Sequence, residues 1–563
     1  MNDVTIPDGQ GAVEGHRQQG ETGRVHRRTI VKGAAWSVPV IATMVALPAA
    51  AASVSPLVTI EVTPNGVTNK LNDVLVTREI DTTVTVKLAD GSPDTSLKTV
   101  TVTLGPGLKF ADDTSTYVYS GTGSSFQIPT TNRVTGEFAG PSTITAVVTS
   151  APTVPSTTLP ITVSPGSFYS LGRHDAFFGN EKATGIVGPS ENQFRINQPA
   201  VFDSFYPVIV RSGQTVAHLS QGGWTAQGFA VTTDGALLGW GRNVNYELGT
   251  GDDVPHPALS PLEVLPAGSV AQAESMEDGI IILKTDGSVL SSTGSVRFPE
   301  GQGGNGGVAT TSPTPVLTAP GVPLGSNIVK VATGPTNGYA LDADGAVWSW
   351  GHGVAGGNGD GSNDDNKYAS PVTFPAGVTI VDIAAAGVDI NGAASVKAVD
   401  SDGNVWTWGR GDRNLSGMNA GSTPTPTIIP GLSGVQKIWG DFTGFAAKTA
   451  SGDVYVWGDA NVEGAQNMLG LNGASAATPT LVPELAGADR VVFSQFSGAA
   501  KFPDGTVKTW GNSENGTPGP IAVPTTLEGF SNVTDIGTYR WGLYVKGDYV
   551  SPIPVPTRDR GIV

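Results

Sequence analysis

The sequence predicts an all-β protein in which a two-sheet β-sandwich precedes a seven-bladed β-propeller. Gly (76) and Pro (40) are frequent, yet 39% of the 563 residues are hydrophobic, a mixture typical of short strands joined by many turns. Between residues 56 and 165, apolar and polar residues alternate as they do in half-buried strands. Between residues 166 and 551, one turn-and-strand pattern recurs at intervals of about 50 residues, which is typical of propellers.

Composition narrows the possible functions. The formal net charge of −17 disfavours nucleic acids and anionic membrane surfaces as partners, because both would be repelled. The chain has no Cys, so neither disulfides nor thiolate-bound metals support its fold. We expect no cofactor and no bound metal.

The first 52 residues have the features of an export signal. Arg27-Arg28 precedes an uncharged stretch over residues 33–52, and Ala50 and Ala52 offer a cleavage site. This arrangement resembles the bacterial twin-arginine (Tat) signal, which implies export of the folded protein and an extracellular or cell-surface location. The alternative is an uncleaved anchor, the one case in which we expect membrane contact. The tail, residues 552–563, carries no signal that we recognise.

Residues 56–165 read as a β-sandwich. The runs 83–88, 99–104 and 142–148 alternate in period two, and Asp90-Gly91 marks a turn between strands. The segment resembles a bacterial Ig-like domain, although it lacks the Cys and Trp core of antibody domains. The resemblance implies either a stalk or an adhesive domain, and we favour the stalk.

The repeat between residues 166 and 551 consists of Asp-Gly followed by a strand that ends in Trp-Gly. Asp344-Gly345 with Trp350-Gly351 is one copy, and Gly supplies the positive φ that a type I′ hairpin turn needs. We expect each Trp to fill the gap between neighbouring blades. Copies begin at Asp234, Asp286, Asp344, Asp402, Ser451 and Asp504, and the second copy has Ser292 in place of Trp.

These repeats resemble the RCC1-like repeat. Trp240-Gly241 is followed by Leu248-Gly249, as in that family, whereas the paired-glycine strands of kelch repeats are not seen. The resemblance implies a seven-bladed propeller. Six units are complete, and the seventh is split between residues 168–173 and 533–550. Strands from both ends of the region are therefore expected to close one blade, which removes exposed sheet edges.

No catalytic residues emerge. Of the six His residues, two lie in the signal segment and four stand at unrelated repeat positions, and no zinc helix, phosphate loop or nucleophile elbow is present. In an antiparallel blade the first and third turns share one face, and these turns carry aromatic, acidic and basic residues. Because Trp, Tyr and Arg dominate protein-binding hot spots, we predict a partner-binding face. The candidates are Trp224, Asp278, Asp389, Asp441, Phe442, Phe496, Tyr539, Arg540, Trp541, Arg242, Tyr246 and Arg410. The alternative interpretation is that these residues cap the blades and pack into the core.

Three functions compete. The favoured one is an exported or cell-surface, non-enzymatic protein, expected to be a monomer, that binds an extracellular protein or glycan with one propeller face. The RCC1 resemblance implies a second, nucleotide exchange on a small GTPase. The third is a glycan-active enzyme, which would need converging carboxylates near the ring centre.

Overall fold

The computed structural model describes residues 57–549, apart from the gaps 65–72, 76–78, 89, 107, 111–113, 129–133, 137–139, 152–153, 165–167, 173–205, 209–213, 223–226, 244–245, 255–260, 277–278, 294–309, 388–392, 461–467, 512–520 and 541. The predicted export signal and the C-terminal tail lie outside these residues. Within the described ranges, no helix has the length and apolarity needed to cross a bilayer.

Two five-stranded sheets are built from residues 57–164. Alternation places Val100, Val102 and Leu104 inward on one strand, and Val84 and Val86 inward on a strand of the other sheet, so that both sheets contribute to one buried cluster. The first sheet holds β1 (Leu57–Pro64), β3 (Glu79–Lys87), β5 (Leu108–Phe110), β7 (Ser125–Gln127) and β8 (Val134–Gly136). The second holds β2 (Asp73–Leu75), β4 (Lys98–Leu104), β6 (Thr116–Gly121), β9 (Gly140–Val148) and β10 (Thr157–Ser164).

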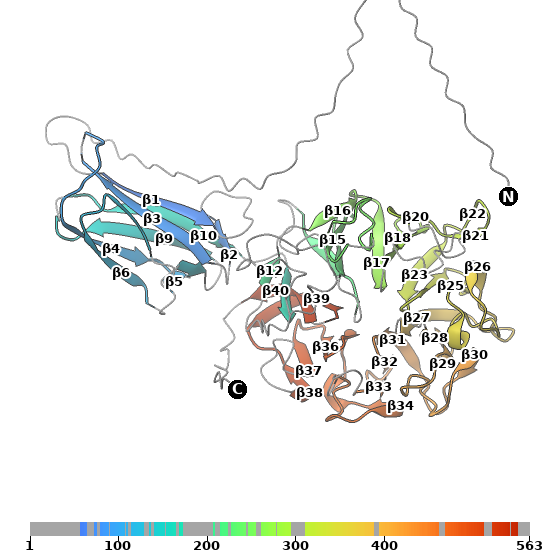
Figure 1. Cartoon of the computed structure of the whole chain (residues 1–563). Helices are drawn as coiled ribbons and strands as arrows, with labels where there is room; N and C mark the ends of the chain where they lie inside the picture. Colours follow the sequence, from blue (N-terminus) through green and yellow to red (C-terminus); the bar gives the residue numbers. More distant parts are fainter. Residues whose placement is uncertain are drawn as a thin grey trace, which may run out of the picture. The chain divides into compact units, whose positions relative to one another are not determined.

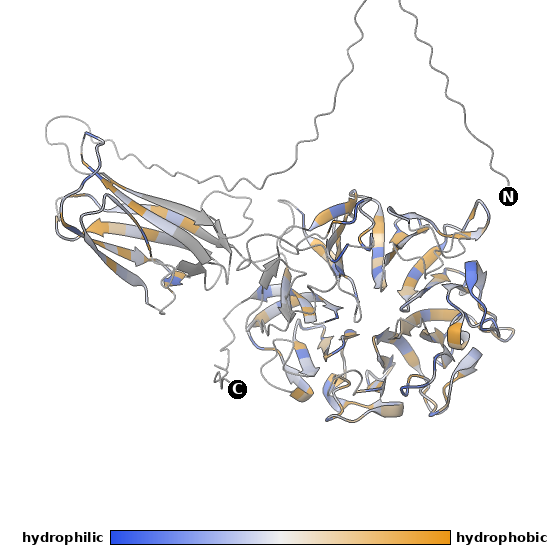
Figure 2. Ribbon diagram, viewed as in Figure 1, coloured by the Kyte–Doolittle hydropathy of each residue, from blue (hydrophilic) through white to orange (hydrophobic). Residues whose placement is uncertain are grey.

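Seven four-stranded antiparallel sheets, the blades, stand in a ring in the rest of the described chain (Figure 1). In six of them four consecutive strands pair in order. Hydrophobic residues concentrate on these strands, as Figure 2 shows. The six blades are β13 (Val216–Leu219), β14 (Gln227–Thr232), β15 (Leu237–Gly241), β16 (Leu262–Leu265); β17 (Val270–Met276), β18 (Gly279–Lys284), β19 (Val289–Thr293), β20 (Thr314–Pro315); β23 (Ile328–Thr333), β24 (Asn337–Asp342), β25 (Val347–Gly351), β26 (Asn366–Pro371); β27 (Ile380–Ala386), β28 (Ser395–Asp400), β29 (Val405–Gly409), β30 (Thr423–Ile428); β31 (Val435–Asp441), β32 (Gly444–Thr449), β33 (Val454–Gly458), β34 (Ala476–Leu481); and β35 (Arg490–Phe493), β36 (Ser497–Lys501), β37 (Val507–Gly511), β38 (Ile521–Thr526).

The seventh blade takes strands from both ends of this region. Its order is β12 (Tyr206–Val208), β11 (Phe168–Gly172), β40 (Gly542–Tyr549) and β39 (Phe530–Tyr539). Leu171 of β11 lies opposite Leu543 of β40 in an antiparallel register. A two-stranded hairpin, β21 (Leu317–Ala319) with β22 (Val322–Pro323), lies between two blades in sequence.

The Asp-Gly turns differ from the predicted type I′ geometry. Gly235 has a φ of 80°, but Asp234 is absent from the described non-Gly residues with positive φ, and a type I′ turn needs positive φ at both central residues. The backbone N–H of Gly235 donates to the carbonyl of Thr232, and that of Thr232 donates to Ala236. The turn is therefore a three-residue loop in which Gly alone takes the left-handed conformation. Only the second residue of the Asp-Gly pair is fixed by backbone geometry.

The repeated Trp side chains fill the spaces between blades, as predicted. Trp240, Trp350, Trp408, Trp457 and Trp510 are all fully buried. The Trp240 indole N–H donates to the Tyr544 hydroxyl at 3.0 Å, and that of Trp510 donates to the Met468 carbonyl at 2.7 Å. Both acceptors belong to the preceding blade. Trp240 and Trp510 therefore join their blades to the preceding ones.

Three of these Trp rings need a glycine opposite them. Gly228, Gly338 and Gly498 pair with Trp240, Trp350 and Trp510 across neighbouring strands. A Cβ atom on Gly338 would lie 2.2 Å from the Trp350 ring. In the blade without Trp, Ser292 lies opposite Ile280. In this blade the larger residue of the facing pair therefore stands on β18, whereas in the three Gly–Trp pairs it stands on the third strand of the blade.

We expect Gly338→Ala to lower the free energy of unfolding by about 2 kcal/mol, because the added methyl group overpacks the space filled by Trp350. Urea unfolding followed by Trp fluorescence would measure it, since residues 56–165 contain no Trp. Gly421→Ala is the matched control: a Cβ there meets nothing within 4 Å. Equal stability of the two variants would contradict the packing argument.

Candidate functional site

The first and third turns of each blade lie side by side, as the sequence predicts. The backbone N–H of Arg410 donates to the Ala394 carbonyl at 2.7 Å, and that of Asp459 donates to Thr443 at 3.0 Å. Each bond joins a third turn to the first turn of the same blade. The two turn types form one surface, called here the turn face.

The predicted aromatic residues on this face are largely buried. Phe442 and Tyr539 are each 1% exposed, and Phe496 is 9% exposed. Phe442 packs in the core cluster of Trp510, and Tyr539 stacks on Tyr544 with ring centroids 4.9 Å apart. For Phe442 and Tyr539 the prediction of contact area for a partner is therefore corrected: their rings fill the core.

The predicted basic residues are engaged within the chain. The Arg242 guanidinium lies 2.9 Å from the buried carboxylate of Glu247. Arg410 binds Asp412 through two hydrogen bonds of 2.6 and 2.9 Å, and Arg540 donates to the Gln495 side chain at 2.8 Å. These bonds hold the arginines in fixed positions.

The remaining candidates separate into three groups. Tyr246 is half-buried with a φ of 61°, so it stays partly accessible on the turn face. Asp441 instead lines a central cavity, where it accepts a hydrogen bond of 3.0 Å from the Thr538 hydroxyl. The last four, Trp224, Asp278, Asp389 and Trp541, lie outside the described residues.

A ring of polar residues at the centre of the propeller was missed by the sequence analysis. At each first strand an apolar residue, any residue, a polar residue and another apolar residue follow one another; the pattern starts before β35, at Ala488, and inside β39, at Val533. Figure 1 shows first strands such as β27 and β31 nearer the centre than the fourth strands β30 and β34. The polar residues, called here the central belt, are His218, Gln272, Lys330, Asp382, Lys437, Arg490 and Asp535.

A β-bulge aims most belt residues. In five first strands the pairing register skips the residue just before the belt position, as between Val270 and Gln272 and between Val435 and Lys437. A bulge breaks strict alternation and redirects the side chain that follows it. This is why the period-two pattern did not indicate the belt. Alignment of the seven first strands would have revealed it.

Most belt residues connect neighbouring blades. The Gln272 side chain donates to the Val331 carbonyl at 3.1 Å and accepts from the Val331 N–H at 3.2 Å. Lys330 forms an ion pair with Asp382, whose other oxygen accepts from the Ile438 N–H at 2.9 Å. Such bonds cross from one first strand to the next and keep the ring in register.

Arg490 and Asp535 join the closing blade to its neighbours. Arg490 pairs with Asp535 and donates to the Leu219 carbonyl at 2.8 Å. Asp535 also accepts from the Leu219 N–H at 2.7 Å. One ion pair therefore links β35, β39 and β13, where the beginning and the end of the propeller meet.

Glu274 lies beside the belt as a deprotonated carboxylate. Burial would raise its pKa, but the hydrogen bond and charge of His218, with Gln272 and Arg490, lower the pKa below its ordinary value of 4.5. Its oxygens lie 3.4 Å from His218 Nε2 and 2.9 Å from the Gln272 amide nitrogen. A carboxylate so held accepts hydrogen bonds and is a poor proton donor near neutral pH.

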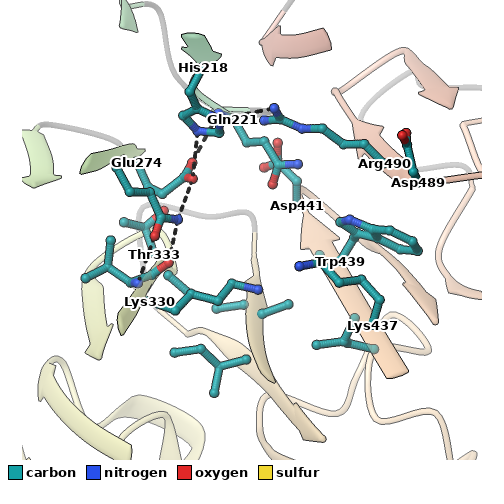
Figure 3. A pocket seen from close by; sticks show the side chains of 18 residues that line it. His218, Gln221, Glu274, Lys330, Thr333, Lys437, Trp439, Asp441, Asp489 and Arg490 are labelled. Atoms are coloured by element: carbon teal, nitrogen blue, oxygen red, sulfur yellow. Dashed lines mark hydrogen bonds and ion pairs between the residues drawn. The ribbon is translucent and has the colours of Figure 1, made fainter. Parts of the chain in front are cut away.

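The central cavity has a volume of about 270 Å³ and a mainly polar lining. Figure 3 shows His218 and Glu274 on one side and Lys437 and Asp441 on the other. Among the described residues, no group of three His, Asp or Glu side chains is arranged to hold a metal ion.

Comparison with known proteins places this geometry in context. No family model matches the chain. Human E3 ubiquitin-protein ligase HERC2 is 33% identical over 177 residues, which is 30% of this chain and 4% of that protein. Protein pim1 of Schizosaccharomyces pombe is 31% identical over 276 residues, or 45% and 48% of the two chains. The bovine secretion-regulating guanine nucleotide exchange factor is 25% identical over 309 residues, 51% of this chain and 64% of that one. The chain thus spans less than two thirds of these relatives.

Solved structures agree on the fold. The match to Prp20p from Saccharomyces cerevisiae, the yeast RCC1, covers 68% of this chain and 92% of the Prp20p chain, with a TM-score of 0.54 and 17% identity. The chain carries an RCC1-like β-propeller. Human WBSCR16 has a similar fold, with a TM-score of 0.53, 18% identity and coverage of 68% and 98%.

We expect Asp535→Ala to lower the free energy of unfolding by about 2 kcal/mol, because it removes the ion-pair partner of Arg490 and the acceptor of the Leu219 N–H. Asp548→Ala removes an exposed carboxylate from the same blade and should change stability by less than about 0.5 kcal/mol. Urea unfolding followed by Trp fluorescence compares them. A neutral Asp535→Ala would show that the belt does not hold the ring closed.

Proposed function

We propose that this protein is an exported or cell-surface, non-enzymatic binding protein whose RCC1-like propeller binds a protein partner with its turn face. The observation that carries the proposal is the fixed turn face itself, in which hydrogen bonds and ion pairs hold long turns in place. Preorganised turns lose little entropy on binding.

The structural relatives support a binding role. The structure of yeast Prp20p is reported together with the binding of Prp20p to Gsp1p and histones, and another structure shows yeast RCC1 with Kap60 bound to it. These partners are known for the yeast protein and not for the present chain. The present chain has a net charge of −17, which disfavours contact with DNA. A glycan partner is a second possibility for the same face.

Export and the spacer role rest on sequence. The Arg27-Arg28 stretch with the small residues before Ala52 supports a Tat-type signal, and therefore an extracellular place of action. The two sheets of residues 57–164 fit an Ig-like stalk that presents the propeller. We propose a monomer with no cofactor.

A glycan-cleaving activity is less favoured. Glycosidases need a carboxylic acid of raised pKa to protonate the leaving group. At the ring centre the pKa of Glu274 is lowered, while Asp382 and Asp535 are held in ion pairs that connect blades. These carboxylates serve the structure of the ring.

Nucleotide exchange is the second candidate, because one relative is a guanine nucleotide exchange factor. If the protein is a non-enzymatic binding protein, as we propose, we expect the purified protein to leave the rate of GDP release from a Gsp1p-type GTPase unchanged. Release of a fluorescent GDP analogue measures this rate, with Prp20p as the positive control. An acceleration that approaches that of Prp20p would favour exchange over the proposed function.

The binding face is tested by substitution at accessible turn residues. Val354→Asp, Tyr246→Asn and Arg413→Asp change three third turns, and Asn and Asp tolerate the positive φ found at Tyr246 and Arg413. We expect this triple variant, used as bait in culture medium and cell extracts, to lose a partner that the unchanged protein captures, with at least tenfold weaker binding.

The matched control carries Leu481→Asp and Val523→Asp on the fourth strands β34 and β38, at exposed positions away from the turns. It should capture the partner as the unchanged protein does. Loss with the control and retention with the turn variant would move the site off the turn face.

A further inference from the structure

One lysine lies inside the packed core of the propeller. Lys397 stands in the middle of β28 and is fully buried. It follows Val396, which lies opposite Trp408. The equivalent residues of two other blades are Phe229 in β14 and Tyr339 in β24, each of which follows a glycine that lies opposite a Trp. A basic side chain therefore occupies a position that these two blades fill with an aromatic ring.

The polar contacts of the Lys397 amine are few and uncharged. The nitrogen donates hydrogen bonds to the Ser395 hydroxyl at 2.9 Å and to the Val396 carbonyl at 3.2 Å, and both acceptors belong to its own strand. It also lies 4.0 Å from the centroid of the Phe445 ring, which comes from β32 of the next blade. In the described part of the chain, no carboxylate forms an ion pair with this amine. A charge at this position would therefore have no counter-ion.

The strands around the Lys397 amine present no charge to it. The neighbours of Lys397 across the sheet are Ala384 in β27 and Thr407 in β29. The other Asp, Glu, Lys, Arg and His residues on β27, β28, β29, β31 and β32 are Asp382, Asp400, Lys437, Asp441 and Lys448. Burial alone accounts for the altered pKa of Lys397, so none of these groups acts on it strongly.

Burial holds the pKa of Lys397 well below its ordinary value of 10.5, because an ammonium group here loses its hydration and gains no opposite charge. The Phe445 ring attracts a cation, but this attraction replaces only part of the lost hydration. The folded chain therefore releases the proton of Lys397 at a lower pH than the unfolded chain does.

We propose that the junction between the blades β27–β30 and β31–β34 is a pH-sensitive point of the ring, which loosens when Lys397 gains a proton. A buried cation without a counter-ion is stabilised by water, and water reaches it only if the two blades separate. Between the lowered pKa and 10.5, the unfolded chain binds a proton that the folded chain lacks, so stability falls as the pH falls through this window. The junction lies inside the ring, so this proposal is independent of a partner at the turn face.

Thermal unfolding of the full chain between pH 6 and pH 10 tests the sign of this effect. Lys397→Met keeps a long side chain and removes the titrating group, so we expect its Tm at pH 7 to exceed that of the unchanged protein by at least about 2 °C. The difference should shrink as the pH rises toward 10. Lys284→Met, at a surface turn, is the control and should shift the Tm equally at every pH. A Lys397→Met variant that is no more stable than the unchanged protein at pH 7 would overturn the proposal.

Thiol labelling locates the opening, since the chain has no Cys of its own. Ala447→Cys places a thiol in the buried cluster that contains Phe445, and Ala340→Cys places one in the cluster of another blade as the control. At pH 7 we expect a maleimide to label Ala447→Cys at least tenfold faster with Lys397 present than in the Lys397→Met background. The control should be labelled at the same rate in both backgrounds. Equal rates at Ala447→Cys, or the same change at both positions, would show that the junction is not a local weak point.

Discussion

The propeller depends on how closely a Trp ring can approach the strand beside it. Trp350 lies against Gly338 so closely that a single added carbon would overlap the ring. Where the ring is missing, at Ser292, the facing residue is Ile280, so the larger side chain of the pair stands on the other strand. Protein interiors are close-packed, and blades of a ring share their packing surfaces on both sides. The facing pairs differ among the blades, since Trp408 lies opposite Val396 and Trp457 lies opposite Phe445. The spacing of blades therefore depends on how each pair packs, and that spacing determines whether the last blade meets the first.

The features of the propeller that could be predicted from the sequence are those marked by patterns of neighbouring residues. The Asp-Gly turns and Trp-Gly strands are short-range patterns, so the blades and the burial of Trp240 and Trp510 followed from sequence. The depth of Phe442 and Tyr539 did not, because an aromatic residue in a turn can point outward or inward, and the neighbours that settle this are distant in sequence. The type I′ assignment failed for a related reason: Asp-Gly occurs in both two- and three-residue hairpins, and the flanking strand register decides between them.

The central belt, in contrast, is defined by contacts between strands that are distant in sequence. Its residues are all polar but differ in charge and residue type, so no single residue marks them, and a bulge before most of them hides their direction from period-two analysis. Their meaning appears when first strands are brought together: a cation from one blade meets a carboxylate from the next, as in Lys330 with Asp382. A chain that is strongly acidic as a whole thus places cations and carboxylates in equal numbers around its central cavity, with Lys330, Lys437 and Arg490 facing Glu274, Asp441 and Asp489. Charge summed over the chain and charge at one site answer different questions.

The closing of the ring by β11 and β40 has a consequence for biosynthesis. Leu171 emerges from the ribosome hundreds of residues before its partner Leu543, so the first part of the closing blade waits through the synthesis of six complete blades. During that interval an unpaired strand edge is available to other chains. A nascent chain that stalls before β39 would lack both the edge partner of β11 and the carboxylate of Asp535. Synthesis of β39 and β40, and not the folding of any earlier blade, therefore marks the moment at which the ring becomes protected from misassembly.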